Sequence, residues 1–124
     1  MTQETLNWLD GQLKEAGIRY QFMRWEEDPP ECYFVGKYLE SPSMTLEENG
    51  YQETTFLLRG FTRGSWALLE AEKAKLEHLF PLREILPSGN GAAALYESAS
   101  SIQTGDYKLE SIKINLTIKE WKVK

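Results

Sequence analysis

The sequence has a single cysteine, Cys32, and a single histidine, His78, among its 124 residues. One cysteine excludes a disulfide within the chain and fits a reducing compartment. A reactive thiol would need nearby positive charge, but the neighbour of Cys32 is Glu31, so we interpret Cys32 as a small buried side chain. His78 has only Ala74 and Leu82 at a spacing of four. We therefore interpret it as a partly exposed helix residue rather than a metal ligand or a catalytic base.

Long apolar runs and basic clusters are also missing. No run of about 18 apolar residues occurs, which excludes a membrane-spanning helix, and residues 1–5 do not begin a secretory signal. Residues 1–62 carry 5 Lys/Arg and 11 Asp/Glu, whereas residues 63–124 carry 9 and 8. Without a basic stripe, binding of nucleic acid through its phosphates is disfavoured. The acidic first half suits either charge-guided assembly with a partner or simple solubility.

Motifs that bind phosphates or metals do not occur. The glycines do not have the spacing of a P-loop or of a dinucleotide-binding loop, and they are expected to serve turns. The carboxylates of Glu26, Glu27, Asp28 and Glu31 are oxygen ligands of the kind that Ca²⁺ and Mg²⁺ take. They lack the alternating pattern and central glycine of an EF-hand, and two prolines interrupt them. A solvated loop tip or a charged docking tip is favoured, and no cofactor is expected.

Apolar periodicity predicts two helices. Leu6, Leu9, Leu13 and Ala16 form one stripe, with Thr2 or Thr5 as N-cap and Gly17 as the left-handed end. The second helix is expected over residues 66–80, with Ser65 as N-cap, three Glu–Lys pairs on its surface and Pro81 as its end.

Alternating and β-branched segments predict about five strands, over residues 19–25, 32–39, 51–61, 92–98 and 107–122. The first two are expected to form a hairpin around the acidic, proline-containing loop. Ser41-Pro42-Ser43 is expected to end the second strand, and Asn49-Gly50 is a turn signal before the third. The sequence predicts one α+β domain with an antiparallel or mixed sheet and both helices packed on one face.

The second half of the chain resembles small tail-completion proteins of siphophages and prophages, similar to the lambda tail terminator. The resemblance is an ordered pattern over roughly residues 51–124: residues 61–66, the charged helix to Phe80-Pro81, the loop Ser88-Gly89-Asn90-Gly91, and the closing segment 109–121. It implies a mixed sheet with helices packed on it and a hexameric ring that caps the tail tube, ends its growth and joins it to the head connector. The implied location is the head-proximal end of the tail in a virion assembled in the bacterial cytoplasm.

The resemblance also implies partners and no chemistry. The chain is expected to be a homo-oligomer when assembled, to contact the major tail tube protein and the head–tail connector, and to let DNA pass without specific binding. An acidic lumen would let phosphates slide, and neutralising Glu26, Glu27 and Asp28 tests that hypothesis. A head-completion protein on the portal side is the near alternative. A small ligand-binding domain or an enzyme with a site assembled only in the fold is the alternative from another class.

Candidate interface residues are chosen from charge and expected exposure. They are Glu26, Glu27, Asp28, Glu47, Glu48, Lys113, Lys119 and Trp121. The final strand adds a further expectation, because sixteen residues at about 3.3 Å each would reach roughly 50 Å, longer than a small sheet needs. We therefore expect it to bend, bulge or project, and deletion of residues 121–124 to impair assembly more than folding.

Overall fold

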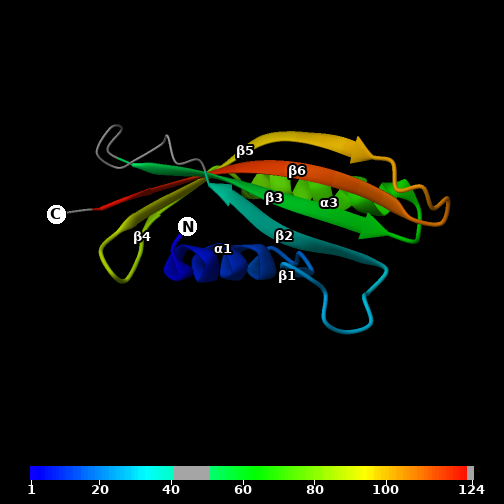
Figure 1. Ribbon diagram of the computed structural model, residues 1–124, viewed down its shortest axis with the longest axis horizontal. Helices are drawn as coiled ribbons and strands as arrows, with labels where there is room; N and C mark the ends of the chain where they lie inside the picture. The colour runs from blue at the N-terminus through cyan, green and yellow to red at the C-terminus, as the bar shows by residue number, and fades with distance from the viewer. Residues whose placement is uncertain (41–50, 123–124) are drawn as a thin grey trace.

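The fold, seen in a computed structural model that describes residues 1–40 and 51–122, consists of two helices and one six-stranded sheet (Figure 1). The helices and strands are α1 (Gln3–Glu15), β1 (Tyr20–Phe22), β2 (Cys32–Glu40), β3 (Gln52–Thr62), α3 (Trp66–Leu79), β4 (Leu82–Ile85), β5 (Gly91–Ile102) and β6 (Glu110–Trp121). The strand order is β1-β2-β3-β6-β5-β4. Only β1 and β2 are parallel, and every other neighbouring pair is antiparallel. The α+β class with a mixed sheet is therefore confirmed.

Helix α1 begins and ends as its sequence predicts. Thr2 is the N-cap, and its side-chain oxygen accepts a hydrogen bond from the Thr5 amide at 3.2 Å. At the other end Gly17 has φ +84°, and the Ile18 amide donates to the Leu13 carbonyl at 3.0 Å. These are the bonds of a Schellman ending, in which a left-handed residue satisfies the last carbonyls of the helix.

Helix α3 carries the expected ion pairs on its exposed surface. Lys73 lies 3.3 Å from Glu70 and 3.9 Å from Glu77, and Lys75 lies 3.0 Å from Glu72. Ser65 occupies the N-cap position, but its side chain makes no capping hydrogen bond. Surface pairs at this spacing each contribute only a few tenths of a kcal/mol, so packing against the sheet holds the helix in place.

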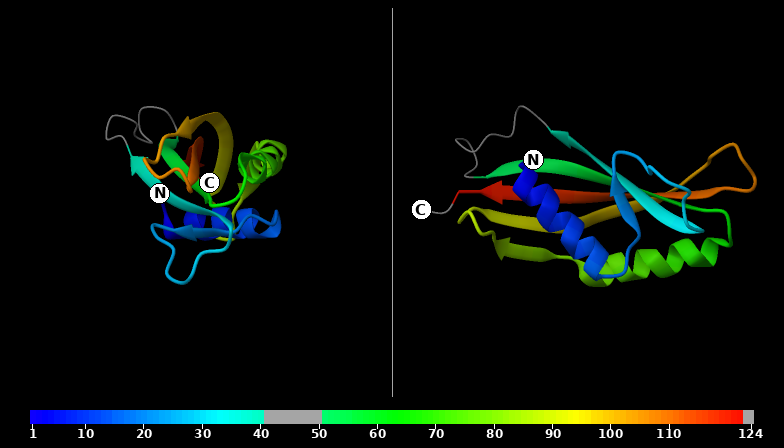
Figure 2. Two further views of the ribbon diagram at one scale, coloured as in Figure 1. Left: turned by 90° about the vertical axis from the view of Figure 1, so that its right-hand side faces the viewer. Right: turned by 90° about the horizontal axis from the view of Figure 1, so that it is seen from below.

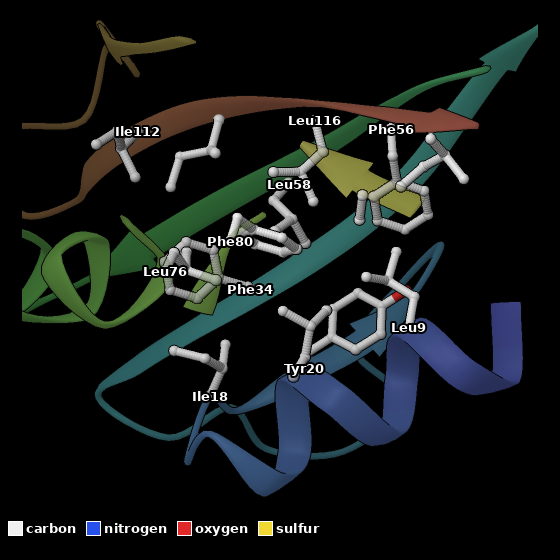
Figure 3. Close-up of a cluster of buried hydrophobic side chains, with 14 of the residues drawn as sticks. Leu9, Ile18, Tyr20, Phe34, Phe56, Leu58, Leu76, Phe80, Ile112 and Leu116 are labelled. Atoms are coloured by element: carbon white, nitrogen blue, oxygen red, sulfur yellow. The ribbon is translucent and has the colours of Figure 1, made fainter. Parts of the chain in front are cut away.

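Both helices pack on the same face of the sheet, as expected, and the sheet curves around them (Figure 2). Figure 3 shows side chains from α1, α3 and the strands meeting in one cluster between the layers. The cluster consists of Leu9, Leu13, Ile18, Tyr20, Phe34, Phe56, Leu58, Leu69, Leu76, Phe80, Ala94, Ile112, Ile114, Leu116 and Ile118. The expected apolar face of the last strand is thus confirmed as core.

Glycine is required where strands approach core rings closely, and Gly36 is an example. A methyl group on Gly36 would lie 2.6 Å from the Tyr20 ring and 2.7 Å from the Phe56 ring. Since interiors are packed at crystal-like density, the two rings occupy the space that any larger residue at this position would need.

The expected hairpin between the first two strands is wrong. Tyr20 pairs with Phe34 and Phe22 with Gly36 in a parallel register. Met23, in a left-handed conformation with φ 71°, turns the chain away, and the loop of residues 24–31 returns it to the start of β2. Alternation shows which face a side chain occupies but not the direction of the strand. Because β1 has only three residues, the chain has to return only a short way, and nine residues can span it.

Four strands differ from the expectation. β1 ends at Phe22 rather than at residue 25. β4 was not predicted, because four residues after a proline give too short a pattern to separate from a loop. β5 runs on to Ile102 through an irregularity between Tyr96 and Ser98. β6 begins at Glu110 rather than at residue 107, so it has twelve residues and spans about 40 Å. The expected features at 41–43 and 49–50 lie outside the described residues.

Candidate assembly surface

The outer face of the sheet, opposite the helices, has no covering layer in the described part of the chain (Figure 2). Its side chains alternate with the core residues along β2, β3, β5 and β6. In a soluble sheet covered on one side, the second face is normally solvated and carries mixed polar groups. The way charge is arranged on this outer face therefore decides what it can bind.

One end of the outer face is basic. Arg59 of β3 lies directly opposite Lys113 of β6, and Lys37 of β2 lies in the next row, opposite Leu57. Directly opposed side chains in an antiparallel pair have Cβ atoms about 5 Å apart, so two cationic side chains leave the sheet side by side here. Within the described residues none of the three has a carboxylate within 4.0 Å. We call Lys37, Arg59 and Lys113 the basic row.

The basic row, together with Arg24 from the acidic loop, lines a surface hollow of about 500 Å³. Its floor is largely apolar, formed by Val35, Leu57, Phe61 and Ile102 together with the exposed Met23. An apolar floor with a cationic rim suits an occupant that brings both carboxylates and an apolar segment.

Arg59 is held in position by its neighbours. Its Nε donates to Ser111 Oγ at 3.3 Å, and its guanidinium lies 5.1 Å from the centre of the Phe61 ring. Phe61 stacks on Tyr33 with ring centres 5.3 Å apart, and the rings of Tyr33 and Trp25 have centres 5.2 Å apart. This aromatic row stiffens the same end of the outer face, and it fixes the guanidinium beside the hollow.

The acidic loop of residues 24–31 projects from the body of the molecule close to this end (Figure 1). Glu26, Glu27 and Asp28 are all exposed. The Glu26 amide donates to Gln21 Oε1 at 3.2 Å, and Gln21 Nε2 donates to Glu27 Oε1 at 3.3 Å. Arg24 Nε lies 3.6 Å from Glu26. The loop therefore has side-chain anchors at its base while its carboxylates remain available to solvent.

The opposite end of the outer face is more acidic. A second hollow of about 490 Å³ is lined by Glu53, Glu97, Leu39 and small polar residues. Thr117 Oγ1 donates to Glu97 at 2.7 Å. Leu39, near the end of β2, is 67% exposed, which is high for a leucine. The outer face thus changes along the strands, from a basic end to a mixed end where Glu53 and Glu97 lie with Lys119.

Two of the predicted interface residues lie elsewhere on β6. Lys119 lies opposite Glu53 and 4.9 Å from the centre of the Tyr51 ring. Trp121 ends the strand, and the guanidinium carbon of Arg83 lies 4.7 Å from the centre of its ring. Lys113 shares the lining of the hollow with Arg24 at the base of the acidic loop, but within the described residues it makes no ion pair with Glu26, Glu27 or Asp28. Lys119 and Trp121 do not line this hollow. Glu47 and Glu48 lie outside the described residues.

Sequence reasoning missed Lys37 and Arg59. Both stand at alternate positions of predicted strands, which was the available signal. Their meeting with Lys113 depends on the register of β2, β3 and β6, and a register cannot be derived from the three segments separately.

Two free strand edges adjoin the outer face. β1 pairs only with Phe34–Gly36, and β4 pairs only with residues 91–94 of β5. Residues 37–40 and 95–102 therefore have a described sheet partner on one side only. Unpaired backbone groups at a sheet edge are available for pairing with another chain.

The described residues offer little for catalysis. No three His, Cys, Asp or Glu side chains in ranges 1–40 and 51–122 gather as a metal site. Burial, followed by the nearby Glu72 charge, raises the pKa of Cys32 to about 11, which disfavours a thiolate at neutral pH. Burial also raises the pKa of Tyr20, and the Asp10 charge adds to the effect. His78 is exposed on α3.

The described helices include none that is long and apolar enough to span a membrane.

Comparison with known proteins supports the fold. No family model matches the chain, and no curated protein matches it. One solved structure, of a protein without a functional name, matches 100% of this chain and 99% of its own, with a TM-score of 0.65 and 17% identity. At that identity the likeness shows a shared fold over the whole chain and carries no function.

Proposed function

We propose that this chain is a non-enzymatic virion assembly protein, which forms a ring at the head-proximal end of a phage tail tube. In this role it ends polymerisation of the tube and provides the joint to the head connector. The implied partners are further copies of the chain, the major tail tube protein and the head–tail connector. DNA passes through the ring without specific binding.

The observation that carries the proposal is the uncovered, charge-divided outer face of the sheet. A basic row at one end, a more acidic hollow at the other and an exposed acidic loop together give the surface a polarity. Head-to-tail contacts between such surfaces generate rings when the rotation closes. The ordered pattern of residues 51–124 that resembles tail-completion proteins supplies the specific role.

Size gives a second, weaker support. The chain exposes 7536 Å². A ring member with two neighbours would bury about 800 Å² at each contact, near one fifth of this surface. A sheet with one bare face and two free edges offers that area without rearrangement of its core.

Tail-tube assembly in vitro tests the proposal. A siphophage major tail tube protein is polymerised with and without the chain, and tube lengths are measured by negative-stain microscopy. We expect shorter tubes with a ring at one end. Unchanged tube lengths over a range of ratios, with no density added at either end, would contradict the proposal. Rings bound to portal or connector complexes instead would favour the head-completion alternative.

A second candidate rests on the hollow beside the basic row. Its volume of about 500 Å³ and its apolar floor are those of a site for a small anionic ligand. A thermal-shift screen with carboxylates, phosphates and nucleotides addresses it. Stabilisation that is lost on changing Lys37 and Lys113 would favour a ligand-binding domain.

A further inference from the structure

We infer that the basic row is the docking site for the acidic loop of a second copy of this chain. The part of the acidic loop that would dock is residues 26–31, Glu-Glu-Asp-Pro-Pro-Glu. This inference rests on the proposed assembly function, because it names the surfaces through which copies join. It also stands on observations of its own, namely unpaired charge, shape and the position of the loop.

Charge is the first observation. Arg59 and Lys113 are directly opposed on neighbouring strands, and Lys37 lies in the adjacent row. Like charges placed directly opposite each other destabilise a sheet. The loop supplies four carboxylates, of which only Glu26 has a described cationic neighbour within 4.0 Å, Arg24. The uncompensated positive and negative groups of one copy therefore match those of another.

Shape is the second observation. The hollow beside the basic row has an apolar floor, so a purely ionic occupant would leave Leu57 and Phe61 exposed. Pro29 and Pro30 can cover such a floor while the flanking carboxylates reach the rim. A proline pair is already restricted in its backbone, so little conformational entropy is lost when the loop binds. Carboxylates facing lysine and arginine then form charge-assisted hydrogen bonds.

The anchoring of the loop is the third observation. Gln21 fixes Glu26 and Glu27 beside β1, and the Arg63 amide donates to the Glu31 carbonyl at 3.3 Å. These contacts fix the ends of the loop to β1 and to the segment after β3, while the side chains of Glu26, Glu27 and Asp28 remain exposed to a neighbouring copy. Binding between copies then occurs without unfolding any described element.

A nucleic-acid strand is the competing occupant, since phosphates also bind lysine and arginine. The aromatic row of Trp25, Tyr33 and Phe61 is already stacked on itself, and this leaves fewer free ring faces for bases. The net charge of the chain is −5, which opposes approach of a polyanion. A short acidic segment carried by the same chain is favoured on both counts.

Charge exchange between two full-length variants tests the inference. One variant reverses the row (Lys37→Glu with Lys113→Glu), and the other reverses the loop (Glu26→Lys, Glu27→Lys and Asp28→Lys). Sedimentation velocity at low salt measures association of each variant and of their equimolar mixture. Arg59 is left unchanged because it also packs on Phe61. Lys122→Glu, an exposed charge change at the far end of β6, is the control for net charge.

We expect the wild type to associate at high concentration. Each reversed variant should lose at least about tenfold in association constant, and the mixture should recover it. Lys122→Glu should behave as the wild type. Should the reversed variants unfold, Lys37→Gln with Lys113→Gln gives a milder loss in the same direction. A labelled peptide of residues 26–31, with its Gln/Asn analogue as control, should bind the wild type and not the row-reversed variant.

Each other outcome overturns the inference. A wild type that stays monomeric and does not bind the peptide contradicts it, as does a mixture that fails to recover association. A twenty-residue oligothymidylate that binds through Lys37 and Lys113, while the peptide does not, replaces it with a nucleic-acid site. Tube capping that is unchanged in the reversed variants leaves the proposed function standing and removes this interface. If the mixture recovers association but no variant or wild type caps tubes, the interface between copies stands and the proposed tail function is contradicted.

Discussion

At the scale of single residues, the sheet contains one pairing that works against its own stability. Arg59 and Lys113 face each other across β3 and β6, whereas Lys119, six residues further along the same strand, faces Glu53. Two lysines on one face of one strand thus have opposite electrostatic environments. Groups that cost stability and persist are expected where function requires them.

Neutralising these two lysines should change stability in opposite directions. Lys113→Gln is expected to raise the free energy of unfolding by about 0.2–1 kcal/mol, because it relieves a like-charge contact. Lys119→Gln should lower it by a similar amount, since it removes an opposite-charge partner of Glu53. Urea unfolding at low salt measures both. Equal changes in the free energy of unfolding for the two substitutions would show that the charge directly opposite each lysine does not affect stability.

Gly36 gives a steric prediction at the same scale. Gly36→Ala places a methyl group against the rings of Tyr20 and Phe56 and should cost about 1–3 kcal/mol. Gly11 is the matched control, because it lies in α1 with no atom within 4 Å of the added methyl group. Gly11→Ala should stabilise the chain by about 0.5–1 kcal/mol. Thermal unfolding distinguishes the two, and a neutral Gly36→Ala would mean that the rings can move aside.

Cys32 gives a prediction about pH. Its pKa is raised to about 11 in the folded chain, by burial first and by Glu72 second. Alkylation by iodoacetamide should therefore be slow at pH 8 and rise steeply only above about pH 9, whereas the urea-unfolded chain reacts near the ordinary thiol pKa. By linkage, the stability contributed by the protonated thiol is present below the unfolded pKa. It is lost as pH rises towards the folded value. Equal folded and unfolded pH profiles would contradict this assignment.

At the scale of elements, α1 is fastened to the end of β6 by one buried carboxylate. Glu120 Oε2 accepts hydrogen bonds from Thr5 Oγ1 at 2.7 Å and from the Thr2 amide and hydroxyl at 3.0 Å each. Glu4, at the start of the same helix, accepts from the Ser88 amide at 3.0 Å. The helix is thus connected at its N-terminal end, where its dipole favours negative charge, to β6 and to the turn between β4 and β5.

Removal of one of these donors should loosen α1. Thr5→Val keeps the side-chain volume and β-branching but removes a hydrogen bond to a charged acceptor, at a cost of about 1–3 kcal/mol. Hydrogen exchange of the α1 amides should accelerate before that of β3 and β6. Thr55→Val, at an exposed position of β3, is the control and should change stability by less than about 0.5 kcal/mol. Uniform acceleration over all elements would mean that α1 opens only with the whole domain.

Sequence patterns were sufficient for some elements and not for others. The limits of α1 follow from Thr2 and Gly17, and the core face of β6 follows from the alternation of four apolar residues, because these signals are local. The parallel pairing of β1 and the existence of β4 depend on long-range partners. Neither a three-residue nor a four-residue strand carries enough pattern to indicate its neighbour.

At the scale of the whole molecule, the same distinction applies to the candidate surface. The acidic loop could be predicted because its carboxylates and prolines are consecutive. Lys113 could be selected for its exposed face but not for its opposition to Arg59. The basic row is assembled from three strands that are far apart in sequence, and only their register brings the charges together.

Association between copies should therefore depend on salt in a way that separates this surface from an apolar one. The Debye length falls from about 30 Å at 0.01 M to about 3 Å at 1 M, so contacts between the basic row and the acidic loop weaken as sodium chloride is added. Apolar contacts are not weakened by this screening. We expect the association constant measured by light scattering to fall by about tenfold or more over this range for the wild type. The association of the Lys37→Gln, Lys113→Gln variant should be weaker at low salt and less dependent on salt, because only Arg59 of the basic row keeps its charge. A wild type whose association strengthens with salt would place the contact on apolar groups such as Leu39 instead, at the other end of the outer face.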